Sequence, residues 1–293
     1  MSLIERKKCP ICNQKNFKLI FCTSFKNVKI NKFLRNHFSK KFPEKIFNNK
    51  NYELNECNIC NVLFQKYIFS NVYHKKLYEE FVDEEISKKK KLNFSTKNLQ
   101  NYFNEFRSVE NNLKKKPKDI KILEIGAGWG YWSLLAKTCN FDIYSVEISS
   151  TRLKYMKKNN LKAFDNVEKL KNKKFDVIYL DQTFEHLQSP YDILKKLRNL
   201  LKKGGLFIIK VPSGLFTKRK LKNNYNFQKD EIIPLEHINT FNYKTFNFIS
   251  KRFGLKILYF FSPYKFTSIK FYKDFIKNIL NYYTNKTVIF KKI

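Results

Sequence analysis

KILEIGAGWGYWSLLAK, residues 121–137, is the stretch of sequence that decides the fold. Residues 120–125 are short and apolar, so they predict a buried strand. A helical pattern begins near Trp129 and continues to about Thr138. Between the two lie three of the seven glycines in this 293-residue chain, Gly126, Gly128 and Gly130. A glycine-rich turn between a strand and a helix lets a ligand approach the backbone and directs free helix N–H groups at it.

Two acidic residues beside this turn restrict the ligand that it can take. The dinucleotide fingerprint is G-x-G-x-x-G, but Tyr131 occupies its last position and the third glycine comes one residue early. Glu124 precedes the turn, where it would repel a pyrophosphate but not a ligand with an ammonium and a sulfonium group. The next strand, 141–146, leads into Glu147, and a carboxylate there can accept hydrogen bonds from both hydroxyls of a ribose.

The turn and its acids resemble motif I of class I S-adenosylmethionine (SAM) dependent methyltransferases, E/D-x-G-x-G-x-G. The resemblance implies SAM as cofactor, Glu147 as the acid on its ribose and Asp165, after a short strand at 161–164, as the acid on its adenine amino group. The residues assigned to the cofactor are Glu124, Gly126, Ala127, Gly128, Gly130, Glu147, Ile148, Asp165, Asp181 and Gln182. The alternatives are a tight turn without a ligand and, for Asp165, an ordinary loop aspartate.

The rest of the chain alternates strands and helices, as an α/β domain does. We expect helices at 151–160, about 190–201 and 243–253, and strands at 175–181, 206–211, 255–261 and 287–292. Gly204-Gly205 predicts the turn before strand five. The pattern F-D-V-I…E-H-L…P…L-K-x-G-G-x-x-x-x-x-V-P resembles the small-molecule branch of the family. It implies a Rossmann-like, seven-stranded sheet with the order 3-2-1-4-5-7-6, whose last strand is antiparallel. The segments 212–240 and 262–286 would then lie on the ligand side or cover the sheet edge.

Two C-x-x-C pairs near the N-terminus indicate a metal site, with the four candidate ligands Cys9, Cys12, Cys57 and Cys60. Four thiolates suit tetrahedral Zn²⁺, and a reduced cytosol argues against disulfides. Asn61 stands where a zinc ribbon usually has glycine, and asparagine tolerates the left-handed conformation needed there. The long spacing predicts an inserted basic loop or helix at 26–51. A closed four-ligand zinc is structural, and four buried or redox-active thiols are the alternative.

We therefore expect a zinc-binding module with an inserted basic segment (1–70), a helical connector that covers the cofactor (71–117) and a SAM-dependent methyltransferase domain (118–293). An amphipathic helix is expected at 98–116, before Pro117. A zinc module ahead of a class I core is similar to sugar C-methyltransferases and related enzymes of surface-glycan or natural-product pathways. The resemblance implies a small hydroxylated or nucleotide-linked acceptor, with a sugar favoured.

Methyl transfer also requires a base for the acceptor's proton. Glu236-His237 resembles the pair assigned as general base in the sugar C-methyltransferases, where an adjacent carboxylate can hold the imidazole tautomer. The alternative is a turn that starts the next helix. His186, after Glu185, is a second candidate, or it orders the loop beneath the cofactor. Tyr78 is the candidate for a tyrosine that those enzymes use, or it is an aromatic residue on an amphipathic helix.

The net charge of +34 allows a second function, an RNA methyltransferase that uses the zinc module and the basic surface. However, only seven of the 59 basic residues are arginine, so compositional bias explains the charge better. The chain reads Leu-Asp-Gln-Thr at 180–183, not the N/D-P-P-Y/F of base-modifying enzymes. A non-catalytic scaffold is a third possibility, against which the intact glycine motif argues.

The location follows from what the sequence does not contain. The sequence contains no run of 18 uncharged apolar residues, so we expect no membrane span. The N-terminal stretch MSLIERKKCP has neither an apolar core nor a small-residue cleavage site of a signal peptide. We therefore expect a cytoplasmic protein.

Overall fold

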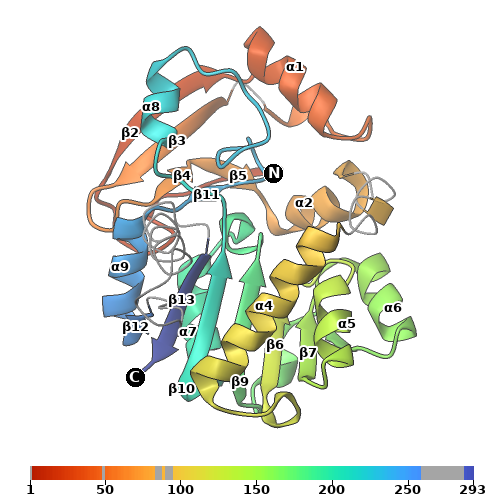
Figure 1. Cartoon of the computed structure of the whole chain (residues 1–293). Helices are drawn as coiled ribbons and strands as arrows, with labels where there is room; N and C mark the ends of the chain where they lie inside the picture. The colour runs from red at the N-terminus through yellow and green to blue at the C-terminus, as the bar shows by residue number, and fades with distance from the viewer. Residues whose placement is uncertain (1, 48–49, 83–87, 90–94, 259–286) are drawn as a thin grey trace.

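A seven-stranded sheet and two smaller sheets organise the chain in the computed structural model, which describes residues 2–47, 50–82, 88–89, 95–258 and 287–293. The N-terminal strands, in red and orange in Figure 1, lie above the α/β part that holds the large sheet. Along these ranges, no helix is long and apolar enough to cross a membrane.

The large sheet has the strand order that the sequence predicted. From edge to edge it contains β8 (Lys162–Phe164), β7 (Asp142–Val146), β6 (Lys121–Ile125), β9 (Phe175–Asp181), β10 (Leu201–Lys210), β13 (Thr287–Lys292) and β12 (Leu255–Ile257). The first five strands are parallel, and β13 is antiparallel to both of its neighbours. If these seven strands are numbered 1 to 7 in chain order, starting with β6, the sheet read from the β8 edge has the order 3-2-1-4-5-7-6. This order confirms the Rossmann-like prediction. The carboxyl ends of the parallel strands form the edge where such sheets bind ligands.

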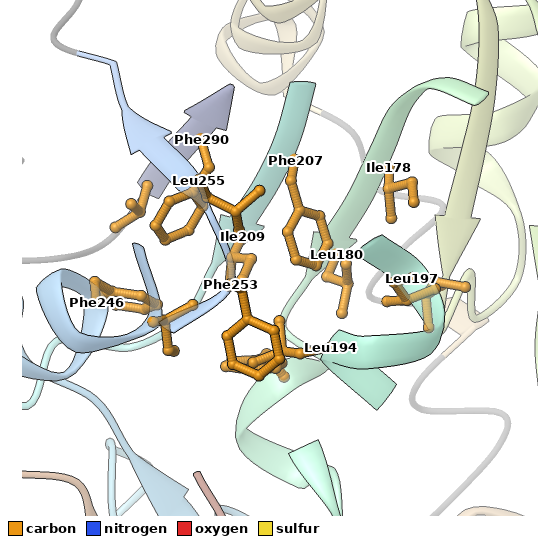
Figure 2. Close-up of a cluster of buried hydrophobic side chains, with 14 of the residues drawn as sticks. Ile178, Leu180, Leu194, Leu197, Phe207, Ile209, Phe246, Phe253, Leu255 and Phe290 are labelled. Atoms are coloured by element: carbon orange, nitrogen blue, oxygen red, sulfur yellow. The ribbon is translucent and has the colours of Figure 1, made fainter. Parts of the chain in front are cut away.

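Helices cover both faces of this sheet, as Figure 1 shows. One face carries α4 (Thr96–Leu113), α5 (Tyr131–Thr138) and α6 (Ser150–Lys158), and the other carries α7 (Pro190–Leu200) and α9 (Tyr243–Arg252). Side chains of β9 alternate between two cores: Val177 and Tyr179 pack under α4 and α5, whereas Ile178 and Leu180 pack under α7. Figure 2 shows the second core, where Leu194 and other α7 residues meet the strands and α9.

Asp176 joins three segments through hydrogen bonds at the amino edge of the sheet. It is buried in β9 and accepts hydrogen bonds from Lys115 Nζ (2.7 Å), Lys202 Nζ (2.8 Å) and the Lys121 backbone N–H (3.0 Å). Burial alone would raise the pKa of Asp176, but the two ammonium groups and the N–H outweigh it and lower that pKa below its ordinary value.

We expect Asp176→Asn to lower the free energy of unfolding by about 1–3 kcal/mol at neutral pH, because charged hydrogen bonds are lost. Because the pKa of Asp176 is lower in the folded state, its ionised form stabilises the protein when the pH is above the ordinary carboxyl pKa. This stabilisation is lost as the pH falls through the lowered folded-state pKa. The urea unfolding curves of wild type and Asp176→Asn should therefore converge at acidic pH. Asp142→Asn, which removes only surface pairs with lysines, is the control with a smaller effect. Equal urea midpoints for wild type and Asp176→Asn at pH 7 would contradict this.

The expected turn at Gly204-Gly205 is wrong, because both glycines lie inside β10. The strand starts at Leu201, and its pairing with β9 shifts register between Leu201 and Leu206. A Cβ on Gly205 would lie 2.9 Å from the Asp176 carbonyl oxygen, so the glycine permits close strand approach at this irregularity. Strand six is described only as β12, and the expected segment 262–286 lies outside the described residues.

The N-terminal module is built on a four-stranded antiparallel sheet with the order β11-β4-β3-β2. Its strands are β2 (Phe17–Ser24), β3 (Asn51–Cys57), β4 (Leu63–Gln65) and β11 (Asn239–Thr240), and β1 (Leu3–Glu5) pairs separately with β5 (Tyr67–Phe69). The expected insertion at 26–51 contains α1 (Val28–His37) and a 3-10 turn, η1 (Glu44–Phe47). The short helices α2 (Asn71–Lys76) and η2 (Leu77–Phe81) follow the module.

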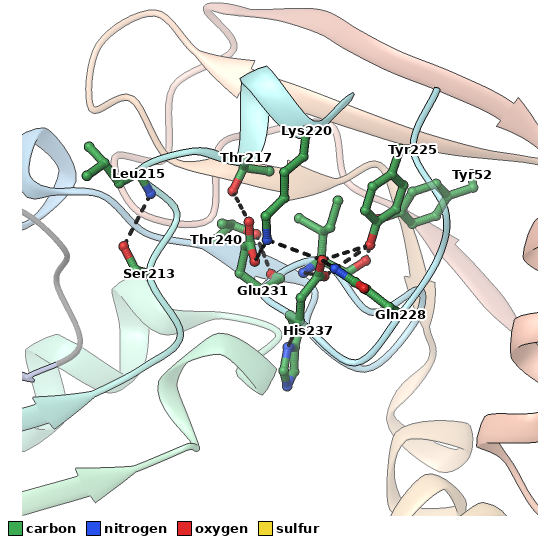
Figure 3. Close-up of polar contacts among 12 residues, drawn as sticks. Tyr52, Ser213, Leu215, Thr217, Lys220, Tyr225, Gln228, Glu231, His237 and Thr240 are labelled. Atoms are coloured by element: carbon green, nitrogen blue, oxygen red, sulfur yellow. Dashed lines mark hydrogen bonds and ion pairs between the residues drawn. The ribbon is translucent and has the colours of Figure 1, made fainter. Parts of the chain in front are cut away.

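The segment between β10 and α9 packs on the N-terminal module. Its strand β11 extends the module's sheet beside β4, and Ile232 and Leu235 belong to the same buried cluster as Ile30 and Leu34 of α1. Polar contacts hold the segment in shape, as Figure 3 shows. Thr217, on α8 (Thr217–Lys222), donates to Glu231 at 2.7 Å, and the Tyr52 hydroxyl donates to the Ile232 carbonyl at 2.9 Å. Residues distant in sequence are thereby placed near the carboxyl edge of the large sheet.

Candidate cofactor and acceptor site

The three glycines of the turn after β6 all have positive φ, and each meets a different environment. A Cβ on Gly126 (φ +70°) would collide with Thr183, and one on Gly130 (φ +74°) would lie 2.7 Å from Met156 Cγ. Gly128 (φ +58°) faces nothing within 4 Å. The outer two glycines are therefore required by packing, whereas Gly128 leaves room for a ligand against the backbone.

Glu124 is buried at the end of β6, where a hydroxyl pair holds its carboxylate. Ser133 Oγ, on α5, donates to Glu124 and is paired with Ser145 Oγ of β7 at 2.7 Å. These contacts fix the carboxylate under the glycine turn.

Glu147 closes the turn from the end of β7. Its carboxylate accepts the Gly128 N–H at 2.8 Å and the Ser149 N–H at 2.9 Å, so both oxygens are oriented by the backbone. Ile148 follows it and exposes 42% of its surface. An oriented acid next to an exposed apolar side chain suits a ribose with an attached flat base.

The remaining cofactor candidates have partners within the protein. Asp165 is exposed and pairs with Lys169 at 2.8 Å. Asp181 lies 3.1 Å from Lys210 Nζ at the end of β9. Gln182 has φ +49°, and its N–H donates to the Lys210 carbonyl. They lie at the carboxyl edge of the sheet, and their assignment to adenine or SAM stays a prediction.

All four histidines of the chain gather near this edge. His186 lies in η5 (Phe184–His186), directly after Thr183, and its ring centroid is 4.9 Å from that of His237. His74 Nε2, on α2, is 3.1 Å from the His186 carbonyl oxygen. His37, at the end of α1, pairs with the carboxylate of Glu236. Helices α1 and α2, the 3-10 turn η5 and the loop before β11 thus bring the four imidazoles together.

Backbone carbonyls set the tautomers of the two central histidines. His186 Nδ1 lies 2.8 Å from the Glu236 carbonyl oxygen, and His237 Nδ1 contacts the Asp230 carbonyl oxygen. A carbonyl can only accept, so each Nδ1 carries the hydrogen and each Nε2 keeps its lone pair. In Figure 3 the His237 ring points away from the contacts of Glu231 and Tyr225. Burial, with the neighbouring His237, lowers the pKa of His186 to about 4, so it is neutral at pH 7.

Glu236 does not orient His237, in contrast to the expectation for this adjacent pair. Its carboxylate instead pairs with His37, 199 residues away. Burial would raise the pKa of Glu236, but the hydrogen bond from His37 and the nearby His186 outweigh it and lower that pKa to about 2. Glu236 is therefore ionised at pH 7, and His37 is its partner from the inserted helix α1.

Tyr78 connects the histidines to the cofactor turn. It lies on η2, and its ring meets that of His186 edge to face at 6.0 Å. The Arg152 guanidinium, on α6, lies 6.0 Å from the same ring. Burial raises the pKa of Tyr78 well above its ordinary value, with the charges of Glu236 and Glu185 adding to the effect, so the hydroxyl is protonated. Among the described residues its oxygen has no hydrogen-bond partner, which leaves it available to a ligand.

The four predicted cysteines meet at one buried point. Cys9 Sγ lies 3.5 Å from Cys60 Sγ, Cys12 Sγ lies 3.5 Å from Cys57 Sγ, and all four sulfurs lie within 4.8 Å of one another. Zn–S bonds of about 2.3 Å in a tetrahedron place the sulfurs about 3.8 Å apart, so this set fits Zn²⁺. Asn61 has φ +60°, the left-handed conformation expected after the second pair.

Sequence reasoning missed three residues of this region. His37 and His74 carried no motif, because nothing local linked them to a site more than 100 residues away. Glu79 was also missed: its carboxylate accepts the Ser150 N–H at 3.1 Å and thereby brings η2 against the start of α6, beside Glu147. Only the small number of histidines in the composition, four, could have drawn attention to the first two.

Comparisons with known proteins identify a family and several similar proteins. A family model described as "Methyltransferase domain" matches residues 96–259, which include the glycine turn and both Glu-His pairs. Malonyl-[acyl-carrier protein] O-methyltransferase 2 from Ilyobacter polytropus is 35% identical over 98 residues, a match that spans 30% of this chain but only 38% of that relative. A SAM-dependent methyltransferase structure from Aquifex aeolicus is 14% identical, with a TM-score of 0.43 over 71% of this chain and 97% of its own. A putative sarcosine dimethylglycine methyltransferase from Galdieria sulphuraria is 14% identical, with a TM-score of 0.42 over 73% and 89%.

Proposed function

This chain belongs to the methyltransferase domain family, and we propose that it transfers the methyl group of SAM to a small hydroxylated or nucleotide-linked acceptor, with a sugar as the favoured class. The observation that carries the proposal is that the histidine cluster and Tyr78 are joined to the glycine turn. Thr183, three residues before His186, packs against Gly126, and the Arg152 guanidinium lies over the rings of both Tyr78 and Trp129. A site for a methyl donor and a set of groups that can act on an acceptor then share one edge of the sheet.

The residues around the turn fit SAM. Gly128 leaves open space for the cofactor to lie against the backbone, and Glu124 would face its ammonium group. Glu147 would accept the ribose hydroxyls, and the exposed Ile148 would lie against the adenine. When bound, SAM supplies an electrophilic methyl group on a sulfonium.

The protein's own contribution is to position and deprotonate the acceptor. In the reaction a bond forms between the acceptor oxygen and the methyl carbon, and the bond between that carbon and sulfur breaks. The acceptor also loses its proton, and the cluster around His186 and His237 is the group of residues that promotes this loss. Tyr78 would donate a hydrogen bond to the acceptor. The printed name of the Ilyobacter relative, an O-methyltransferase, supports oxygen as the acceptor atom.

The cysteine cluster would hold a structural zinc ion through Cys9, Cys12, Cys57 and Cys60. Its four protein ligands leave no open position, so it takes no part in the reaction. The zinc would hold the module that supplies His37 and, through the following segment, Tyr78. Reduced thiols agree with a cytoplasmic location.

The test is a methylation assay with labelled SAM and a panel of nucleotide sugars and free hydroxylated compounds. We expect label transfer to one class, with kcat/KM for His237→Ala reduced about 100-fold or more, in the range of general acid–base effects. Calorimetry with S-adenosylhomocysteine (SAH) should give unchanged binding for this variant, because His237 lies outside the cofactor turn. Transfer to RNA with a steep salt dependence, and none to small acceptors, would replace this proposal with the RNA methyltransferase.

A further inference from the structure

Glu185 differs from the other acids of the site in having no partner. It is 1% exposed, and within the described residues neither carboxylate oxygen accepts a hydrogen bond. A buried polar group without a partner is costly, and a buried charge more so. Both oxygens of this buried carboxyl group are therefore open to a ligand that the described residues do not supply.

Two imidazoles lie beside this carboxylate. His186 Nε2 is 4.0 Å from Glu185 Oε1, and one ligand atom each from Glu185, His186 and His237 lie within 4.8 Å of one another. Both histidines donate Nδ1–H to backbone carbonyls, which leaves both Nε2 lone pairs available. Metal-ligating histidines are oriented by such hydrogen bonds from the other ring nitrogen.

We propose that Glu185, His186 and His237 bind a divalent first-row transition-metal cation at the acceptor side of the site. Two imidazoles and one carboxylate are a set that such cations take with positions left open, whereas Mg²⁺ and Ca²⁺ prefer oxygen ligands alone. Ligands at about 2.1 Å from a cation lie about 3–4 Å apart, so small side-chain rotations close the observed spacing. The site is separate from the cysteine cluster, whose four thiolates leave no room for an acceptor.

The role of this cation rests on the methyl transfer proposed above. An open coordination position would take the acceptor's hydroxyl oxygen, and the positive charge would lower the pKa of that hydroxyl. The O–H bond then breaks and the proton passes to water. The oxygen forms its bond to the methyl carbon as the carbon–sulfur bond breaks, which leaves the methylated acceptor and SAH. The histidines act in this case through the cation rather than as separate bases.

The test is a titration of zinc-replete protein, first treated with a mild chelator, with Mn²⁺ followed by electron paramagnetic resonance. Mn²⁺ is a useful probe because thiolate clusters select softer ions. We expect one Mn²⁺ bound per chain, displaced by added Zn²⁺, and a loss of affinity of about 10-fold or more in Glu185→Gln and in His237→Ala. His74→Gln, which keeps an N–H donor toward the His186 carbonyl, is the matched histidine control and should bind as wild type does.

Folding of the variants is checked in the same samples. Glu185→Gln is isosteric, so it should fold, and near-ultraviolet circular dichroism verifies this. Mn²⁺ should raise the melting temperature of wild type but not that of Glu185→Gln. Absence of Mn²⁺ binding to folded wild type, or binding that survives both substitutions, overturns the metal site. SAH binding together with methyl transfer in metal-free protein would leave the methyltransferase function and reject the cation. Absence of SAH binding would reject the function and not the metal.

Discussion

Removal of zinc from the cysteine cluster is expected to unfold the N-terminal module. Structural zinc contributes on the order of 10 kcal/mol or more in small sites, which is comparable to the whole stability of a domain. The four cysteines are buried together with Ile11, Val62 and Phe64 in the same core as the α7 side of the large sheet. The Tyr191 N–H, on α7, also donates to the Pro10 carbonyl at 3.0 Å, so the first C-x-x-C pair is docked on the α/β part.

The substitution that tests this is Cys57→Ser, compared with wild type before and after exposure to a strong chelator. In Cys57→Ser we expect the zinc content to fall from one ion per chain to none and the near-ultraviolet circular dichroism signal to be lost. The melting temperature should fall by more than about 10 °C, which corresponds to a loss of several kcal/mol in the free energy of unfolding. Cys139→Ser, on the far side of the α/β part, is the control and should keep its zinc. A zinc-free protein that melts at the wild-type temperature would contradict the structural role.

Gly128→Val is expected to abolish cofactor binding while the fold survives. The Cβ of the new side chain would project into the open space of the turn, and its methyl groups would occupy the volume assigned to SAM. A β-branched residue at φ +58° also costs about 1–2 kcal/mol of backbone strain. We expect SAH affinity to fall at least about 100-fold, equivalent to about 2.7 kcal/mol.

Gly254→Val is the matched control for this strain. Gly254 has the same φ of +58° and lies after α9, where a Cβ would come 3.2 Å from the flexible end of Arg198. Both variants should lose similar thermal stability, but only Gly128→Val should lose SAH. If the two variants bind SAH equally well, the turn is a structural feature and the cofactor lies elsewhere.

The large sheet and its order could be predicted because its signals are local. Strand β9 has the bounds expected from a buried apolar run, and the glycine turn identified β6 and α5. The Gly204-Gly205 expectation was wrong because glycines also permit close approach of strands, and sequence alone does not separate that use from a turn. The short strand β11 was also missed, since two residues carry no periodicity.

The acceptor side was predictable only in part. The two Glu-His pairs could be recognised, but the partners of their side chains could not, because the contacts join residues from α1, α2 and the loop before β11. Glu236 pairs with His37 and not with its neighbour, and Glu185 has no partner among the described residues. Such pairings depend on how the segments pack, which no local pattern of the sequence encodes.

Calorimetric titration of the zinc-replete protein with SAH tests the central claim, that the glycine turn and Glu147 form a SAM site. We expect one SAH bound per chain with a micromolar dissociation constant, no binding of NAD, and loss of SAH binding in Glu147→Ala. Circular dichroism of that variant is recorded alongside, because Glu147 is buried and its carboxylate accepts hydrogen bonds from two backbone N–H groups. Absence of SAH binding to protein shown to be folded and zinc-loaded would contradict the methyltransferase account.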